Sequence, residues 1–590
     1  MKKKLVIIIS LILSNQLFCA YLVNVPQTIT QPNGVTINCF VTGDEFYSWL
    51  HDSNNFTIVR NQNTGYYSYA MLVDNVLVAS PYIVGVNDPV NSGLTPGINL
   101  SNQEIITRIN AQSLKSVPQN RLLSKSNVAK SKTAQTQQTL NNIVVYIRFS
   151  DQDEFPASQN QYTTYFNGSG ASDVSMYNYF NEISYGLSNI TSTFYPNNNG
   201  TIIISYQDAH TRNYYRPESI VGDSGYCEIY PCYTEREYRE NALIKNALNY
   251  VKSQIPMSLN LDGNVDGNVD NICFIVRGNV GGYTEWNKIL WPHKGTLAPY
   301  TNYAINSKYV RNYNFQFELN LDVEVLCHEM GHTLGAPDLY HYTNPYDMIP
   351  LGNWDIMCIG STIPVSICAY TKYKYMGFIN EIPIISSSGH YTLQPIISST
   401  NNCYKIQSSN PNEYFVLEFR QKTGTFESNI PGTGLLIYRI NNSVAYGNSQ
   451  GPPDEVYLYR PNGTLTNNGN YTIANFNSAN SRSIFNSLSN PYSFLSDGSI
   501  ENFVIKNITV SGNSISFDVR LCSNTDITLS NTNMLPEVSN AVNTLNTSGS
   551  VIVKATDRIT FEAGHEIILN TGFEVQQGGQ LDVNIVTCGQ

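Results

Sequence analysis

One segment of this 590-residue chain restricts its fold and chemistry more than any other. It runs from residue 321 to 338 as LDVEVLCHEMGHTLGAPD. At 100° per residue, an α-helix through this segment gathers apolar side chains on one stripe. The stripe contains Val323, Leu326, Met330 and Leu334, with Cys327 at its edge. His328 and His332 lie on the opposite side, and Glu329 completes an HExxH pattern. The segment predicts a helix that packs against a core and holds two imidazoles over a cleft.

In an HExxH helix the two histidines bind Zn²⁺, and the glutamate accepts a proton from a water molecule. A catalytic zinc ion needs a third protein ligand and an open fourth position. Gly335 can adopt the positive φ that ends a helix, and Pro337 cannot continue one. The chain can therefore turn back and bring Asp338 under the metal as the third ligand. His341 is a competing third ligand, which we rank below Asp338.

The spacing HExxHxxGxxD resembles the extended motif of the metzincin clan of zinc proteases. The sequence from Trp354 to Met357 looks like the Met-turn of that clan, with Met357 as an apolar floor beneath the metal. The tyrosine that metzincins carry two residues after this methionine is absent, since Ile359 stands there. His293 and Tyr340 are the remaining candidates for stabilising the oxyanion or contacting substrate.

These residues predict hydrolysis of internal peptide bonds. Zn²⁺ held by His328, His332 and Asp338 would lower the pKa of water toward roughly 7 and polarise the scissile carbonyl. Glu329 would take the proton of that water and deliver it to the leaving amine. A purely structural zinc site would instead close all four positions with protein ligands and would need no general base.

Residues 260–270 carry oxygen-bearing side chains on alternate positions, interrupted by glycines. The candidate metal ligands are Asp262, Asn264, Asp266 and Asp270. Proteins bind Ca²⁺ with such clusters of carboxylate and amide oxygens. The spacing is not that of an EF-hand, and an Asx-rich turn without an ion has the same sequence signature. Calcium binding and an ion-free turn therefore both stay open.

The region around this loop predicts alternating strands and helices. An apolar run at 143–149 predicts a buried strand. Ser172 can cap a helix, and a second helix covers about 234–255. Short runs of alternating apolar and polar residues on both sides of this region predict β-structure. We expect an α+β chain in which a metzincin-like zinc protease domain lies between β-rich units.

Changes in composition along the chain predict five segments. Residues 1–20 form a signal peptide, and residues 21–138 form a β-rich propeptide with a basic linker. Residues 139–380 form the catalytic domain. Residues 381–521 form a β-sandwich-like unit, and residues 522–590 a short β-repeat module that resembles a small β-solenoid. The linker is rich in lysine and arginine, so it offers natural cleavage sites.

The N-terminus predicts export. Lys2, Lys3 and Lys4 precede an apolar run from Leu5 to Leu13, and cleavage after Ala20 fits a secretory signal. No later apolar run is long enough to cross a membrane. The formal net charge of −11 argues against a nucleic-acid-binding surface. We expect a secreted or extracellular protein, either free in the medium or associated with the cell surface.

Export also makes disulfide bonds feasible for the ten of the 11 cysteines that remain after removal of the signal peptide. Two pairs are close enough in sequence to staple local loops, and a third pair brackets the C-terminal module. These pairs are Cys227 with Cys232, Cys358 with Cys368, and Cys522 with Cys588. Cys273 and Cys327 have apolar neighbours, so they are either buried free thiols or a further pair.

From about residue 25 to 440 the chain resembles the immune inhibitor A-type metallopeptidases, secreted bacterial zinc proteases made as zymogens. The motifs that carry this resemblance follow the order of that family. They are Gly43 to Trp49, Tyr179 to Gly186, the Asp-Gly-Asn repeat, Ile289 to Lys294, Gly331 to Asp338, Trp354 to Met357, and Glu413 to Gln421. The resemblance implies zinc, proteolysis and an activating protease that removes the propeptide. Residues 522–590 resemble the coat-hanger-like β modules of secreted proteins from some Gram-negative bacteria.

The sequence therefore predicts a secreted zinc endopeptidase that acts on protein or peptide substrates and is made as a zymogen. Latency would be steric, or a propeptide group would occupy the open metal position. Cys39, Asp44 and Glu45 are the available groups, although Cys39 also suits a strand core. The alternative is a cell-surface adhesin or binding protein with an inactive or very narrow protease domain. An intact Glu329 argues against that alternative.

Overall fold

The computed structural model describes most of the chain. The described residues are 22–44, 47–61, 63–74, 76–101, 104, 138–197, 202–217, 224–226, 235–281, 285–286, 289–297, 303–342, 348–521, 526–541 and 543–585. Several predicted features lie outside them. These are the signal peptide, most of the basic linker, Glu45, and the pairs Cys227/Cys232 and Cys522/Cys588.

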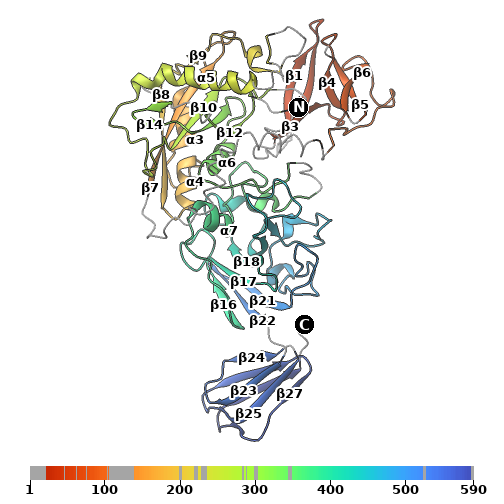
Figure 1. Cartoon of the computed structure of the whole chain (residues 1–590), viewed down its shortest axis with the longest axis vertical. Coiled ribbons are helices and arrows are strands. Elements are labelled where there is room, and N and C mark those ends of the chain that lie inside the picture. The colour runs from red at the N-terminus through yellow and green to blue at the C-terminus, as the bar shows by residue number, and fades with distance from the viewer. Residues whose placement is uncertain are drawn as a thin grey trace, which may run out of the picture.

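The molecule is elongated (Figure 1). At one end, the N-terminal sheet lies beside the sheet that carries the HExxH helix. The region 381–521 follows, and the C-terminal module lies at the opposite end (Figure 1). The chain contains both helices and strands and is rich in strand, which agrees with the expected α+β class.

The N-terminal unit is an antiparallel sheet whose strands follow in chain order. They are β1 (Leu22–Thr30), β2 (Thr36–Gly43), β3 (Tyr47–His51), β4 (Thr57–Arg60), β5 (Tyr67–Val73) and β6 (Val76–Ile83). A short strand from the next region, β11 (Glu285–Trp286), pairs antiparallel with β3. Val41 and Leu50 lie in the same buried core as Val145 and Phe274 of the central sheet. The N-terminal unit is therefore packed against the region that follows it.

The central sheet has the order β12-β15-β10-β7-β8, with β9 paired to β7. Its strands are β7 (Gln138–Arg148), β8 (Ser188–Tyr195), β9 (Tyr206–Gln207), β10 (Asn271–Val276), β12 (His293–Thr296) and β15 (Asn312–Phe317). Neighbouring strands are parallel except β12 and β15, which are antiparallel. A separate pair is formed by β13 (Ala304–Ile305) and β14 (Lys308–Tyr309).

Helices cover both faces of this sheet because its strands are apolar on both sides. One face carries α3 (Gln159–Asn167), α4 (Met176–Ile183) and α6 (Val323–Thr333), and the other carries α5 (Glu235–Val251). Along β7, Val144 and Tyr146 belong to the first core and Ile143 and Val145 to the second. This alternation follows from the two-residue period of a strand.

The start of α4 differs from the prediction. Its cap is Ser175, whose hydroxyl accepts the N–H of Asn178 at 3.1 Å, and not Ser172. The preceding residues form a turn instead, because the Asp173 carboxylate accepts the N–H of Gly170 at 2.8 Å. The two serines are three positions apart in the sequence, and this tight turn decides which hydroxyl reaches the helix.

Two antiparallel sheets make up the region after residue 381. One contains β17 (Cys403–Gln407), β18 (Glu413–Arg420), β19 (Gly434–Asn441) and β20 (Val456–Leu458), and the other contains β16 (Gly389–Leu393), β21 (Phe503–Ser511) and β22 (Ser514–Leu521). Phe415 and Leu417 of β18 face a core shared with Phe517 of β22. Val416, on the other face of β18, lies in the core that contains the HExxH helix. One apolar core therefore crosses residue 380.

Single-turn elements connect these layers. They are η2 (Arg212–Tyr215), η3 (Lys252–Gln254), η4 (Gly352–Trp354), α7 (Ala369–Thr371), η5 (Lys372–Met376), η6 (Glu427–Asn429), η7 (Tyr471–Ile473) and η8 (Ser478–Asn480). The segment expected to form the Met-turn begins at the last residue of η4, and α7 follows it in the chain.

The C-terminal module pairs its strands in parallel. They are β23 (Asp526–Thr532), β24 (Val538–Ala541), β25 (Thr544–Val553), β26 (Arg558–Ala563), β27 (Glu566–Ile568), β28 (Phe573–Val575) and β29 (Gln580–Ile585). The pairs join strands of successive turns of the chain, as β24 does with β26 and β26 with β29. This is the pairing that a small β-solenoid requires. Among the described residues, no helix is long and apolar enough to cross a membrane.

The six described cysteines are all buried free thiols. They are Cys39, Cys273, Cys327, Cys358, Cys368 and Cys403. The predicted local bond between Cys358 and Cys368 is therefore not formed. Short sequence separation misled the prediction, because each thiol is buried within the apolar core around the HExxH helix. For Cys273 and Cys327, the free-thiol alternative agrees with the structure.

Candidate metal centre

Helix α6 begins as its sequence dictates. The carboxylate of Asp322 caps it by accepting the N–H of Val325 at 2.8 Å. The apolar stripe packs into the core, where Leu326 and Met330 are fully buried. The opposite side is also covered: His328 is fully buried, and only 15% of the His332 side chain is exposed. The two imidazoles therefore lie in a covered site rather than over an open cleft.

The chain folds back after α6 as its glycine and proline predict. Gly335 has a φ of +104°, and the N–H of Ala336 donates to the carbonyl of Gly331 at 3.0 Å. This turn brings Asp338 to the two histidines. Its Oδ1 lies 3.3 Å from Nε2 of His328 and 3.3 Å from Nε2 of His332. The three ligand atoms all lie within 4.8 Å of one another.

Backbone carbonyls fix the orientation of both imidazoles. Nδ1 of His328 donates to the carbonyl of Ile356 at 3.2 Å, and Nδ1 of His332 donates to the carbonyl of Ala336 at 2.8 Å. A carbonyl only accepts hydrogen bonds, so the proton of each neutral ring is on Nδ1. Each Nε2 then points a lone pair at the Asp338 carboxylate. Such an arrangement needs a cation, either a proton or a metal ion, between the rings and the carboxylate.

The electrostatics of the metal-free site follow from this geometry. Burial alone would lower the pKa of His332, but the facing Asp338 carboxylate outweighs it and raises that pKa to about 9. Burial alone would raise the pKa of Asp338, but the imidazoles of His332 and His328 hold it well below its usual range. A metal ion would have to displace the proton that this pairing retains.

The donor set fits a zinc ion. Nε2 of His328 and Oδ1 of Asp338 are buried without a hydrogen-bond partner among the described residues. Buried polar atoms without partners are rare and call for an explanation such as an ion. Two imidazole nitrogens and one carboxylate oxygen are ligands that zinc prefers, and three protein ligands leave a fourth position for water or substrate.

Glu329 is the one acid of the motif that would not bind the metal. Both of its carboxylate oxygens are buried without a hydrogen-bond partner among the described residues. Burial raises the pKa of Glu329, and the neighbouring imidazoles of His328 and His332 oppose this rise. A carboxylate whose pKa is shifted upward beside a metal site is suited to general acid–base catalysis.

The segment that resembles a Met-turn lies against α6. A Cβ atom added to Gly331 would lie 3.1 Å from Sδ of Met357, so this position of the helix is open to the methionine. Asp355 shapes the turn, because its carboxylate accepts the N–H of Met357 at 2.9 Å and of Cys368 at 2.8 Å. The same turn supplies the Ile356 carbonyl that orients His328.

A loop from the region 381–521 holds the backbone of the third ligand. The N–H of Asn448 donates to the carbonyl of Asp338 at 2.9 Å, and the N–H of Tyr342 donates to the carbonyl of Ser449 at 3.1 Å. Gly447 has a φ of +82°, and a Cβ there would lie 2.1 Å from the Asp338 carbonyl oxygen. Only glycine allows this approach.

Replacing Gly447 by alanine is therefore expected to displace Asp338 and weaken zinc binding at least about 10-fold, besides costing about 1–3 kcal/mol of backbone strain. Gly377→Ala is the matched control, because Gly377 also has positive φ but has nothing near its Cβ position. Zinc titration against a chromophoric chelator measures the loss of affinity caused by displacing Asp338. Thermal unfolding of the same variants measures the loss of stability caused by backbone strain. Equal zinc affinities in the two variants would contradict the assignment.

His293, a candidate for oxyanion stabilisation, makes its hydrogen bonds to groups outside the His328/His332/Asp338 cluster, although it is close enough to oppose the rise in the pKa of Glu329. Its Nδ1 lies 2.7 Å from the Trp291 carbonyl, and its Nε2 lies 2.8 Å from Oε1 of Glu240. Tyr313 donates to the same Glu240 oxygen at 2.7 Å. These contacts make His293 part of a buried network on the α5 side of the sheet. Tyr340 is buried, and its ring lies 5.4 Å from that of Tyr342.

His341, the competing third ligand, is not at the metal centre. Its Nε2 lies 2.5 Å from a carboxylate oxygen of Asp454, and both side chains are buried. Of the propeptide groups considered for latency, Cys39 is buried within the core of the N-terminal sheet, where burial raises its pKa to about 12. Asp44 accepts the N–H of Tyr47 at 2.8 Å. The structure thus favours a core role for Cys39.

The carboxylates of the candidate calcium loop are occupied by protein donors. Asp262 accepts the N–H groups of Asp266 and Gly267 at 2.8 and 2.9 Å and pairs with Lys308 at 2.6 Å. Asp270 accepts the N–H of Asn141 at 2.9 Å. Asn264 and Asp266 interact with each other at 3.4 Å. These contacts are those of an Asx-rich turn, and calcium binding stays a prediction without support from this geometry.

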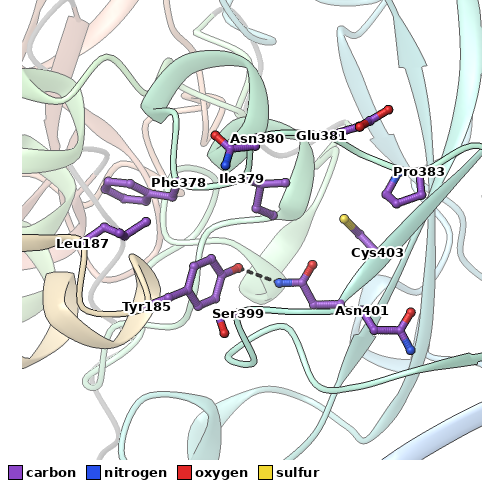
Figure 2. A pocket seen from close by; sticks show the side chains of 11 residues that line it. Tyr185, Leu187, Phe378, Ile379, Asn380, Glu381, Pro383, Ser399, Asn401 and Cys403 are labelled. Atoms are coloured by element: carbon purple, nitrogen blue, oxygen red, sulfur yellow. Dashed lines mark hydrogen bonds between the residues drawn. The ribbon is translucent and has the colours of Figure 1, made fainter. Parts of the chain in front are cut away.

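A cavity of about 370 Å³ lies elsewhere, between the end of α4 and the strand β17 (Figure 2). Its lining includes Tyr185, Phe378, Asn401 and Cys403, and the Tyr185 hydroxyl accepts a hydrogen bond from Asn402 at 2.9 Å. No predicted metal ligand lines it. Because it lacks a charged group in a reactive setting, we assign no chemistry to it.

Sequence reasoning missed three contributors to the metal centre. Tyr342 donates to Asp338, Asp355 shapes the segment that resembles a Met-turn, and the loop at 447–449 holds the backbone of the candidate ligand Asp338. Tyr342 follows Asp338 by four residues, and this closeness was the only available signal for it. Nothing in the local sequence of the 447–449 loop indicates a contact with residue 338.

Comparisons with known proteins give little further information. No protein-family model matches the chain, and no curated protein matches it. Among solved structures, wild-type OgpA from Akkermansia muciniphila is similar over 54% of this chain and 94% of its own, with 9% sequence identity and a TM-score of 0.23. A similarity this distant supports no statement about fold or activity.

Proposed function

We propose that this protein is a secreted, zinc-dependent endopeptidase of the immune inhibitor A type, made as a zymogen and acting on protein substrates. The observation that carries the proposal is the buried group of His328, His332 and Asp338 next to Glu329. A chance HExxH sequence would require neither a third ligand at this distance nor a buried acid without a hydrogen-bond partner.

The roles of the residues follow from their chemistry. His328 and His332 would hold the metal through Nε2, and Asp338 would hold it through Oδ1. Bound there, Zn²⁺ supplies a Lewis acid that polarises a carbonyl and lowers the pKa of water toward about 7. Glu329 would accept a proton from the attacking water and deliver it to the leaving amine. The carbonyls of Ile356 and Ala336 keep both imidazoles in the tautomer that leaves Nε2 free for the metal.

An extended substrate suits the edge of the central sheet. β12 is its antiparallel edge strand, and it lies next to α6. The backbone of an edge strand can pair with a peptide that adds to the sheet. A peptide bound in this way would run beside the helix that carries the ligands.

Zymogen activation is supported by the packing of the N-terminal sheet. This unit shares a buried core with the central sheet, and the basic linker separates the two in sequence. Cutting the linker alone would leave the unit attached by its contacts. Activation would therefore require its dissociation or further degradation as well as cleavage.

The test is casein cleavage by the chain after limited proteolysis of the linker, followed by removal of both the N-terminal unit and the added protease. Chelation is expected to abolish cleavage and added Zn²⁺ to restore it, and His332→Ala is expected to be inactive at any zinc concentration. His565→Ala is the control, because His565 is exposed in the C-terminal module. If zinc-loaded wild type were no more active than His332→Ala on several protein substrates, the adhesin alternative would take the place of this proposal.

A further inference from the structure

The two carboxylate oxygens of Asp338 have different partners. Oδ1 faces both histidines, whereas Oδ2 accepts a hydrogen bond from the Tyr342 hydroxyl at 2.5 Å. A carboxylate held at one oxygen has its rotation restricted, so the other oxygen keeps its direction. Tyr342 therefore controls which oxygen of the ligand points into the metal centre.

The ring of Tyr342 packs against the N-terminal unit. It belongs to a small cluster around Tyr47, together with Trp49 and Leu100. We call this group the Tyr47 cluster. Tyr47 lies on β3, and β3 also pairs with β11 of the following region. The N-terminal sheet is thus anchored by backbone pairing at the point where its side chains touch Tyr342.

We propose that Tyr342 is a positioning residue for the metal ligand Asp338 and that the N-terminal unit acts on the metal centre through its contact with Tyr342. This inference rests on the proposed metal site and deepens it by naming how the N-terminal unit communicates with the ligands. The Tyr47 cluster restricts the tyrosine ring, and the ring carries the hydroxyl that holds Oδ2. Loss of the N-terminal unit removes the packing on that side and leaves Tyr342 more freedom to move.

The hydrogen bond is tested with Tyr342→Phe, which keeps the ring and removes the hydroxyl. The zinc dissociation constant, measured by chelator competition on the full-length chain, is expected to rise by about 10–100-fold. Tyr206→Phe is the matched control, because the Tyr206 hydroxyl donates to the Asp208 carboxylate at 3.0 Å far from the ligands in sequence. An unchanged zinc affinity in Tyr342→Phe would overturn the proposal.

The coupling to the N-terminal unit is tested with a double-mutant cycle. Tyr47→Ala is expected to raise the zinc dissociation constant in the wild-type background, because it frees the ring of Tyr342. In the Tyr342→Phe background the same substitution should have a much smaller effect. Tyr69→Ala, a truncation in the same sheet outside the Tyr47 cluster, controls for general loosening of that unit. Strict additivity of Tyr47→Ala and Tyr342→Phe would overturn the coupling.

These measurements need no substrate, so they separate this inference from the proposed function. A chain that binds zinc but cleaves nothing would refute the endopeptidase and leave the role of Tyr342 intact. A chain that cleaves casein while Tyr342→Phe keeps wild-type zinc affinity would refute the positioning role alone.

Discussion

Replacing Glu329 by glutamine is expected to lower kcat/KM for protein substrates by about 10²–10⁴-fold while zinc stoichiometry stays unchanged. The amide has the shape of the carboxylate, but it cannot accept the proton of the attacking water. Because the Glu329 carboxylate is buried without a hydrogen-bond partner among the described residues, removing its charge should not destabilise the fold. The measurement is hydrolysis of a fluorogenic casein, with metal content determined on the same samples.

The control for this variant is Glu182→Gln on α4. Glu182 is a partly buried glutamate, and burial together with the Glu427 carboxylate raises its pKa to about 7. It is not among the metal-centre residues, so this variant should keep its activity. Equal activity of Glu329→Gln and wild type would contradict the general-base role. Loss of zinc from Glu329→Gln would instead indicate that the residue supports the ligands.

The sequence could predict those features of the candidate metal centre that depend only on residues close together in the chain. Two histidines four residues apart share a helix face by helix geometry, and a glycine two residues after the helix end allows the chain to reverse. Both properties depend on neighbouring residues only, and His328, His332 and Asp338 lie together as expected. The periodic strands and helices of the central sheet were predictable for the same reason.

Contacts between distant segments could not be predicted in this way. The covering of His328 and His332 was missed because a helical wheel shows which side faces a core but not what covers the other side. Lys308, which pairs with Asp262, lies 46 residues away in the chain, so the loop's oxygen pattern could not distinguish an ion from an ammonium group. The hydrogen bond from the N–H of Asn448 to the carbonyl of Asp338 likewise has no signature in the local sequence.

A second large effect is expected from Arg420, a buried residue on β18. Its guanidinium bonds both oxygens of Glu427, at 2.6 and 2.7 Å, and donates to the Trp354 carbonyl at 2.7 Å. The side chain is fully buried, and Glu418 lies 3.3 Å away. Replacing Arg420 by methionine would remove the cation that contacts both buried carboxylates and leave only the more distant ammonium group of Lys372 to interact with them. Breaking a buried pair in this way costs about 3–5 kcal/mol, to be measured as a fall in unfolding free energy in urea.

Two further variants serve as controls for this prediction. Adding Glu427→Gln to Arg420→Met should recover part of the loss, because it removes one stranded charge. Arg558→Met, at an exposed arginine of the C-terminal module, should stay within about 0.5 kcal/mol of wild type. A loss below about 1 kcal/mol in Arg420→Met would contradict the structural role of this network.

The same network bears on where the proposed catalytic region ends. Arg420 donates to the carbonyl of Trp354, the first residue of the segment that resembles a Met-turn, and the carbonyl of Ile356 in the same segment orients His328. Arg420→Met should therefore weaken zinc binding as well as stability, although it touches no ligand. A fragment cut at residue 380 would lack Arg420 and the loop at 447–449, and it should bind zinc poorly. If such a fragment bound zinc as tightly as the whole chain, the dependence of the metal centre on the following sheets would be refuted.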